Sequence, residues 1–290
     1  MRRLISLLAV LGTCPALAAA LPGEAAAHHS VRGAQHAGPS GDGILLGTDT
    51  TVPDTPTYWN SPTWSGWIDI ANKNVELRYV TANFTVPTVH CGASGEEALF
   101  FVGLDGWSAT GIPVPVNKTV EQAGVFVKCD ISTPSGIMPS YHAWYEMYPD
   151  PSHTGGAVSA GDTIAVSVYH NSATGDYSLA LGDSNSTSPD FNVTKTCPSG
   201  YTCHNATAEV IVEDPDHGAP NGVYLANFGT IGFIDVAVTS RNGTHGNLLG
   251  NSLWTANKIT MVYPGSTVMA LPGGRNANYT GFNETWKSSG

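Results

Sequence analysis

The sequence predicts an all-β protein: an antiparallel β-sandwich of two large sheets, of the concanavalin A or jelly-roll type, in a single domain. Short apolar or alternating runs recur between clusters of Gly, Pro and Asn, and the 290 residues include 33 Gly and 19 Pro. Beyond the first 20 residues, no stretch has the 3.6-residue apolar rhythm of a long helix. A single sandwich commonly reaches this length, so we expect one domain rather than two.

The N-terminal segment predicts export. Met1-Arg2-Arg3 precedes an apolar run, and Ala-rich residues follow to Ala27, which is typical of a secretory signal peptide over residues 1–27. Residues 28–56 lack periodicity and are predicted to be a flexible arm or short propeptide, which leaves 57–290 for the sandwich. No later segment approaches the ~20 apolar residues of a membrane span. We therefore expect a secreted, extracellular protein that leaves the membrane once the signal is removed.

Seven segments combine apolar character with turn residues at their ends. Asp105-Gly106 and Asn242-Gly243 are turn signals between such segments. No repeat of fixed period is evident, which argues against a propeller. The expected strands include Ala98–Asp105, Val120–Lys128, His142–Tyr148, Thr163–Tyr169, Ala208–Glu213, Gly232–Thr239 and Lys258–Tyr263.

Four cysteines remain after the signal, and an exported protein can form disulfides. Cys197 and Cys203 enclose a short Pro-Ser-Gly turn, so we pair them locally and pair Cys91 with Cys129. Zinc is the rival interpretation, but no CxxC or HExxH spacing is present. We expect no metal and no cofactor.

Charge and missing motifs exclude several function classes. The chain has 12 Lys and Arg against 23 Asp and Glu, a net charge of −11, which excludes a nucleic-acid binder. It has no Gly-x-Ser-x-Gly elbow, no Asp-Thr/Ser-Gly motif and no free mature cysteine for nucleophilic catalysis. The chemistry that remains is that of carboxylates helped by an amide.

Strand parity places these groups, because successive side chains of a strand point to opposite faces. Four predicted strands each combine an apolar back with a face of carboxylates, an amide and aromatic rings. If the four faces belong to one sheet, they form a polar, aromatic-lined groove above a dry core. Along the chain, these faces carry Phe101, Gly103 and Asp105; Gln122, Gly124 and Phe126; Trp144, Glu146 and Tyr148; and Glu209, Ile211 and Glu213.

Seven short motifs occur in an order that resembles the glutamic peptidases (eqolisins, peptidase family G1), particularly their bacterial branch. The resemblance spans about Trp59 to Tyr263. It implies a sandwich of two large antiparallel sheets, secretion, and endopeptidase activity at acid pH on polypeptides without a metal. The motifs are Thr63-Trp-Ser-Gly66, Phe84-Thr-Val-Pro87, Val102-Gly-Leu-Asp-Gly106, Glu121-Gln-Ala-Gly124, Tyr141-His-Ala-Trp-Tyr-Glu-Met-Tyr-Pro-Asp150, Ala208-Glu-Val-Ile-Val-Glu213 and Ala226-Asn-Phe-Gly229.

By motif match, the resemblance assigns the catalytic pair to Gln122 and Glu209. Glu209 would take a proton from water and return it to the leaving nitrogen, while Gln122 would hold the water and stabilise the oxyanion. The chain departs from the family pattern at Phe101, Ala123, His142 and Val210, which bears on subsites and pH optimum. The resemblance places substrate-binding residues at Trp64, Asp105, Trp144, Glu146 and Tyr148.

Two alternatives stay open. A jelly-roll glycoside hydrolase would use Glu209 and Glu213, four residues apart on one strand face, as its paired carboxylates. A non-catalytic carbohydrate-binding sandwich would use the aromatic residues alone. For the peptidase we expect a monomer that acts on polypeptide substrates.

Overall fold

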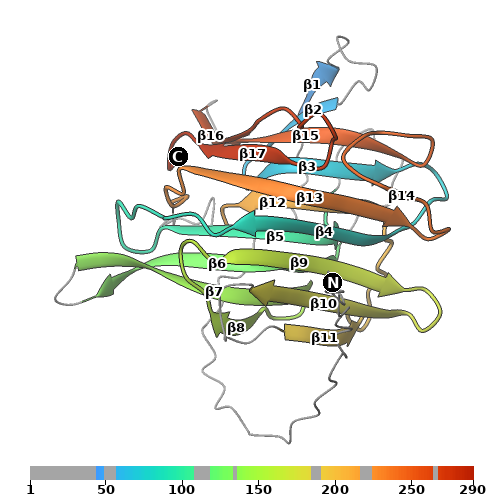
Figure 1. Cartoon of the computed structure of the whole chain (residues 1–290), viewed down its shortest axis with the longest axis horizontal. Coiled ribbons are helices and arrows are strands. Elements are labelled where there is room, and N and C mark those ends of the chain that lie inside the picture. Colours follow the sequence, from blue (N-terminus) through green and yellow to red (C-terminus); the bar gives the residue numbers. More distant parts are fainter. Residues whose placement is uncertain are drawn as a thin grey trace, which may run out of the picture. The chain divides into compact units, whose positions relative to one another are not determined.

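The computed structural model describes residues 44–48, 57–107, 118–132, 136–183, 191–215, 224–263 and 267–290. The predicted signal peptide and most of the predicted arm lie outside them. All elements that the structure describes are strands (Figure 1). The described residues therefore contain no helix long and apolar enough to cross a membrane. The strands are β1 (Ile44–Thr48), β2 (Thr57–Ser61), β3 (Trp64–Ala71), β4 (Leu77–Thr85), β5 (Glu97–Asp105), β6 (Val120–Ser132), β7 (Gly136–Tyr148), β8 (His153–Ala157), β9 (Thr163–Asn171), β10 (Asp176–Asp183), β11 (Phe191–Thr196), β12 (Thr207–Glu213), β13 (Thr230–Ser240), β14 (His245–Gly246), β15 (Trp254–Tyr263), β16 (Thr267–Pro272) and β17 (Phe282–Trp286).

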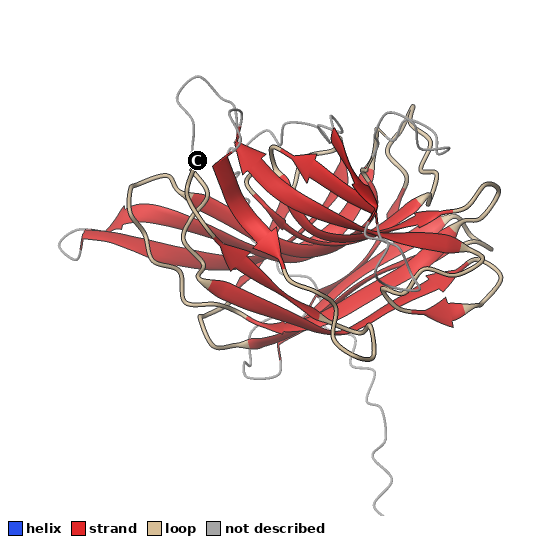
Figure 2. Cartoon of the chain, turned by 90° about the horizontal axis from the view of Figure 1, so that it is seen from above, coloured by secondary structure: helices blue, strands red, loops and turns tan. Residues whose placement is uncertain are grey.

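The strands lie in two layers (Figure 2). Hydrogen bonding orders the first layer β2-β15-β3-β12-β5-β6-β7-β8. The second layer is ordered β17-β13-β4-β9-β10-β11. β16 pairs with both β15 and β17, so the hydrogen-bonded network continues from one layer into the other. All of these pairs are antiparallel except β2 with β15, which confirms the predicted all-β, antiparallel class.

The main core lies between the layers, where the apolar sides of both sheets meet. Phe100, Val102 and Leu104 of β5 are fully buried in it, as the alternation in that segment predicts. Phe84 of β4 contacts Phe100 from the other layer, with ring centroids 6.4 Å apart. Such contacts between the layers remove the largest apolar side chains from water and hold the two sheets together.

A second cluster covers the opposite face of the first layer. It contains Trp64 of β3, Phe101 of β5, Trp144 of β7 and Ile211 of β12, all buried. Because both faces of the sheet are covered, all nine residues of β5 are buried, although only alternate ones belong to the main core. This second face is the one that parity predicts to carry the polar groups.

The two predicted disulfides are present. Cys91 is joined to Cys129 of β6, and Cys197 is joined to Cys203 in the segment between β11 and β12. The first disulfide closes a loop of 38 residues in sequence and the second a loop of six. The second therefore constrains the segment from which the strand carrying Glu209 begins.

Candidate active site

The polar groups meet in one row across four strands of the first layer. Glu209 of β12 lies opposite Gly103 of β5, Gly103 opposite Gln122 of β6, and Gln122 opposite Glu146 of β7. Directly opposite residues in antiparallel strands project from the same face of the sheet. The three side chains therefore share one surface, with a glycine between the glutamate and the glutamine.

Gly103 leaves open the space between Glu209 and Gln122. A Cβ atom at this position would lie 3.5 Å from Cβ of Gln122 and 3.5 Å from Oε2 of Glu209. The two side chains therefore approach one another above the glycine, although their strands are separated by β5. Any larger residue at position 103 would project into this space.

Gln122 is oriented by its neighbour on β7. Its Nε2 donates a hydrogen bond of 2.7 Å to Oε2 of Glu146, and the side chain is only 2% exposed. Its Oε1 is buried without a hydrogen-bond partner in the part of the chain that the structure describes. Burial raises the pKa of Glu146 from 4.5 to about 8, against the smaller lowering effect of the Gln122 hydrogen bond. At acid pH Glu146 is therefore a neutral acceptor for the amide.

Glu209 is fully buried, and this burial raises its pKa well above the usual value. The nearby Thr207 hydroxyl lowers the pKa, and the negative charges of Asp105, Glu121 and Asp69 raise it further. Within the described ranges, neither carboxyl oxygen has a partner at hydrogen-bonding geometry. The Glu209 carboxyl and Oε1 of Gln122 are thus two buried acceptor groups, carried by residues on either side of Gly103.

Aromatic side chains occupy the next two rows of the same face, Phe101 and Trp144 in the first and Trp64 in the second. Trp64, Phe101 and Trp144 follow one another across the sheet, with ring centroids 5.7 Å and 5.9 Å apart. Trp64 also stacks on Trp107, with centroids 6.3 Å apart. Tyr148, two residues beyond Glu146 on β7, is half-buried, and burial raises the pKa of its phenol. The site therefore combines polar groups with an apolar wall.

Asp105 differs from the simple parity expectation. Its backbone is left-handed, with φ of 65°, so the strand alternation ends one residue early. Its carboxylate accepts hydrogen bonds from the backbone N–H groups of His204, Asn205 and Ala206, at 2.6, 2.8 and 2.7 Å. Both oxygens are thereby bound to the segment that precedes β12.

Glu213 shares the face with Glu209 but belongs to another row. It lies opposite Trp64 of β3 and Leu99 of β5, and burial raises its pKa to about 8. Four strand residues correspond to about 13 Å along β12, whereas a retaining glycosidase needs carboxyls about 5 Å apart. The partner that the sheet brings to Glu209 is the Gln122 amide rather than a second carboxyl on β12.

Sequence reasoning missed the spacing role of Gly103 and the contribution of Trp107 to the apolar wall. An isolated glycine inside an otherwise apolar strand often marks a place where another group approaches closely, and this signal could have indicated the role of Gly103. Within the described ranges, no three His, Cys, Asp or Glu side chains converge in a way that could hold a metal ion.

Comparison with known proteins identifies the family of the chain. Residues 62–269 match the Peptidase A4 family. The chain is 30% identical over 261 residues to Aspergillopepsin-2 from Aspergillus niger. This alignment covers 80% of this chain and 84% of Aspergillopepsin-2.

Solved structures show the same fold. A crystal structure of scytalido-glutamic peptidase with a transition state analog inhibitor has a TM-score of 0.60 at 22% identity and covers 78% of this chain and 99% of its own. The structure of SCP-B, an eqolisin in complex with the tripeptide Ala-Ile-His, has a TM-score of 0.57 at 22% identity with the same coverage. From the family match and the identity to Aspergillopepsin-2, the chain belongs to the Peptidase A4 family and is a glutamic endopeptidase.

Proposed function

We propose that this protein is a secreted acid endopeptidase in which Glu209 and Gln122 together activate one water molecule. The observation that carries the proposal is the row Glu209–Gly103–Gln122, in which the glutamate and glutamine side chains lie on either side of a glycine and project from the same face. A water placed there can donate one O–H to each acceptor. Its lone pair is then directed away from the sheet, toward a substrate carbonyl lying on the face.

Glu209 supplies the proton transfers. In its ionised form it takes a proton from the attacking water, and in its protonated form it returns that proton to the leaving nitrogen. A raised pKa makes the carboxylate a stronger base and lets the protonated group persist until the peptide bond breaks. Such general acid–base catalysis contributes about 10²–10⁴ in rate.

Gln122 supplies the polar support that does not titrate. One N–H of its amide binds Glu146, so the second N–H is free to stabilise the oxyanion that develops on the substrate. Because an amide has no pKa in this range, Gln122 keeps this role at any pH at which the protein is folded. Glu146 holds the amide in the orientation that presents Oε1 to the water.

Activity is expected on the acid side of pH 8. Burial raises the pKa of both Glu146 and Glu213 to about 8, so both are neutral at acid pH. Above this value, their ionisation adds two negative charges to the face that carries Glu209. These charges repel the carboxylate and the oxyanion that forms during the reaction.

The substrate is an extended polypeptide lying along this face. A transition state analog and a tripeptide are bound by the structural neighbours, and the buried aromatic cluster of Trp64, Phe101 and Trp144 lies beside the polar row on the same face. The predicted N-terminal signal, the two disulfides and the likeness to a fungal peptidase support an extracellular location.

The test is cleavage of denatured casein between pH 3 and 6 by the purified mature protein. We expect Glu209→Gln to reduce kcat by about 10²–10⁴-fold and Gln122→Ala to reduce it by about 10²–10³-fold. Glu284→Gln is the matched control, because Glu284 is equally buried but lies on β17, where it binds Ser65. A Glu209→Gln protein that cleaves casein at the wild-type rate would refute the proposal.

A further inference from the structure

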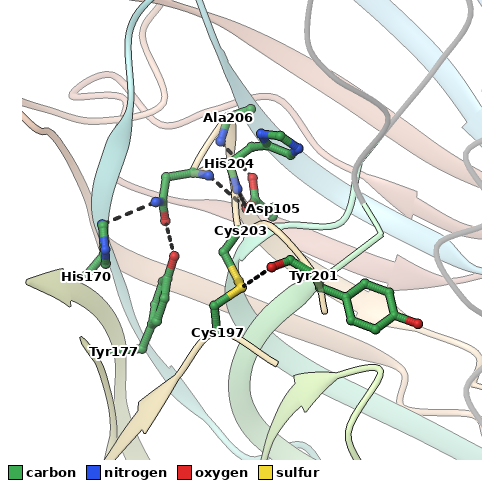
Figure 3. The surroundings of a disulfide bond; sticks show 9 residues. Asp105, His170, Tyr177, Cys197, Tyr201, Cys203, His204 and Ala206 are labelled. Atoms are coloured by element: carbon green, nitrogen blue, oxygen red, sulfur yellow. Dashed lines mark hydrogen bonds between the residues drawn. A yellow bond between two sulfur atoms is a disulfide. The ribbon is translucent and has the colours of Figure 1, made fainter. Parts of the chain in front are cut away.

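The start of β12 is held by one side chain from the end of β5. Both oxygens of the Asp105 carboxylate are used, Oδ2 by the N–H groups of His204 and Asn205 and Oδ1 by that of Ala206 (Figure 3). The carboxyl group is fully buried, which raises its pKa, whereas the three backbone N–H hydrogen bonds lower it. These three bonds link distant parts of the chain through one side chain.

The backbone on both sides of this link is unusual. Asp105 and Asn205 both lie in the left-handed region, with φ of 65° and 52°. Non-glycine residues remain in that region only when surrounding contacts hold them there, and such residues cluster at functional sites. Here the left-handed turn at Asn205 directs successive N–H groups toward one point, which forms an anion-binding nest for the carboxylate.

A second layer of contacts fixes the nest from behind. The Tyr177 hydroxyl donates to Oδ1 of Asn205 at 2.9 Å, and Nδ2 of Asn205 lies 3.2 Å from Nδ1 of His170. The rings of His170 and Tyr177 are stacked with centroids 4.6 Å apart (Figure 3). These two residues belong to β9 and β10 of the second layer, and the Cys197–Cys203 disulfide closes the loop immediately before the nest.

The nest leads directly into the strand that carries Glu209. Ala206 is the last residue before β12, and its carbonyl accepts a hydrogen bond from the N–H of Ala71 at 2.8 Å. Glu209 follows three residues later, fully buried and with little room to adjust. A shift of the nest would therefore move Glu209 relative to Gln122, whose strand is fixed independently by β5 and β7.

We propose that Asp105 is a positioning residue that sets the place of Glu209 through the backbone of residues 204–206, rather than a residue that contacts the substrate. This inference rests on the proposed catalytic role of Glu209. It predicts a particular kinetic signature. A misplacement of about 1 Å at a catalytic group costs about 100-fold in rate, while remote substrate contacts are kept.

The experiment compares casein-peptide hydrolysis by the wild type, Asp105→Asn and the control Glu284→Gln. We expect Asp105→Asn to lower kcat by about 100-fold with KM within about twofold, because only transition-state geometry is lost. Glu284→Gln should keep the wild-type kcat. A folded Asp105→Asn protein with unchanged kcat, or with a loss confined to KM, would overturn the proposal.

A second measurement covers an Asp105→Asn protein that fails to fold. In the wild type, amide hydrogen exchange at residues 204–206 should be as slow as at the centre of β12, because a buried carboxylate holds those N–H groups. Fast exchange at residues 204–206 would overturn the proposal that Asp105 holds this segment. If the wild type does not cleave casein at all, the proposed function fails, and the exchange result still decides whether Asp105 holds the segment.

Discussion

Replacing Gly103 by alanine inserts a methyl group into the space between the proposed catalytic side chains. That methyl would lie 3.5 Å from Oε2 of Glu209 and 3.5 Å from Cβ of Gln122, with the Glu121 carbonyl oxygen at 3.4 Å. These are van der Waals contacts that the fold can accept. A water bound to Glu209 needs an oxygen–oxygen distance of about 2.8 Å on the same side, and the methyl group occupies that place.

The expected result separates activity from stability. Losing the water removes general-base catalysis, so kcat/KM should fall by about 10²–10⁴-fold. The melting temperature should hold or rise slightly, since a compatible Gly→Ala change stabilises by about 0.4–1 kcal/mol through the unfolded chain. Gly103→Ala is therefore expected to leave the melting temperature unchanged or slightly raised while it removes most of the activity.

The assay pairs acid proteolysis with thermal unfolding for Gly103→Ala and for the control Gly232→Ala. Gly232 lies on β13 of the second layer, where, among the described residues, a Cβ would meet the Asn283 side chain at 3.1 Å. The control should keep wild-type activity. A Gly103→Ala protein that is fully active would refute the idea that a water between Glu209 and Gln122 is the nucleophile.

Three further predictions concern the supports of the site. Glu146→Leu should lower kcat by about tenfold, because the Gln122 amide loses its acceptor, and Glu146→Gln should restore kcat. Equal kcat in the wild type and both variants would show that Glu146 does not orient Gln122. Thermal stability should fall as pH rises from about 4.5 to 8, because Glu146 and Glu213 keep protons in the folded state that the unfolded chain releases. Each group then lowers the free energy of unfolding by up to roughly 3 kcal/mol at pH 7. A melting temperature that increases from pH 4.5 to 8 would show that burial does not raise these two pKa values. Replacing Cys91 and Cys129 by alanine should cost about 4 kcal/mol for a 38-residue loop, measured by denaturant unfolding, and an unchanged midpoint would contradict it.

The strands and their faces could be predicted from the sequence because alternation is a local property. The segment Ala98–Asp105 was expected as a strand and forms β5, with Phe100 and Val102 in the core as parity requires. The expected strand Val120–Lys128 continues to Ser132, because it pairs with β7 along its full length in a long hairpin. Local pattern therefore identified the element but not its end.

The neighbours of each strand could not be predicted in the same way. Parity puts Glu209 and Gln122 on polar faces, but only the order β12-β5-β6 brings them to either side of Gly103. That order is set by packing between residues far apart in sequence. The orientation of Asp105 was also beyond reach, because a left-handed φ interrupts alternation and the partner amides lie about 100 residues away.

A double-mutant cycle decides whether Glu209 and Gln122 act on one water molecule. The measurement is kcat/KM for acid proteolysis by the wild type, Glu209→Gln, Gln122→Ala and the protein with both changes. If the two side chains hold the same water, the double variant should be no slower than about the worse single variant, since the second change removes nothing that remains. If the two single losses instead multiply in the double variant, Glu209 and Gln122 act independently and do not share a water molecule.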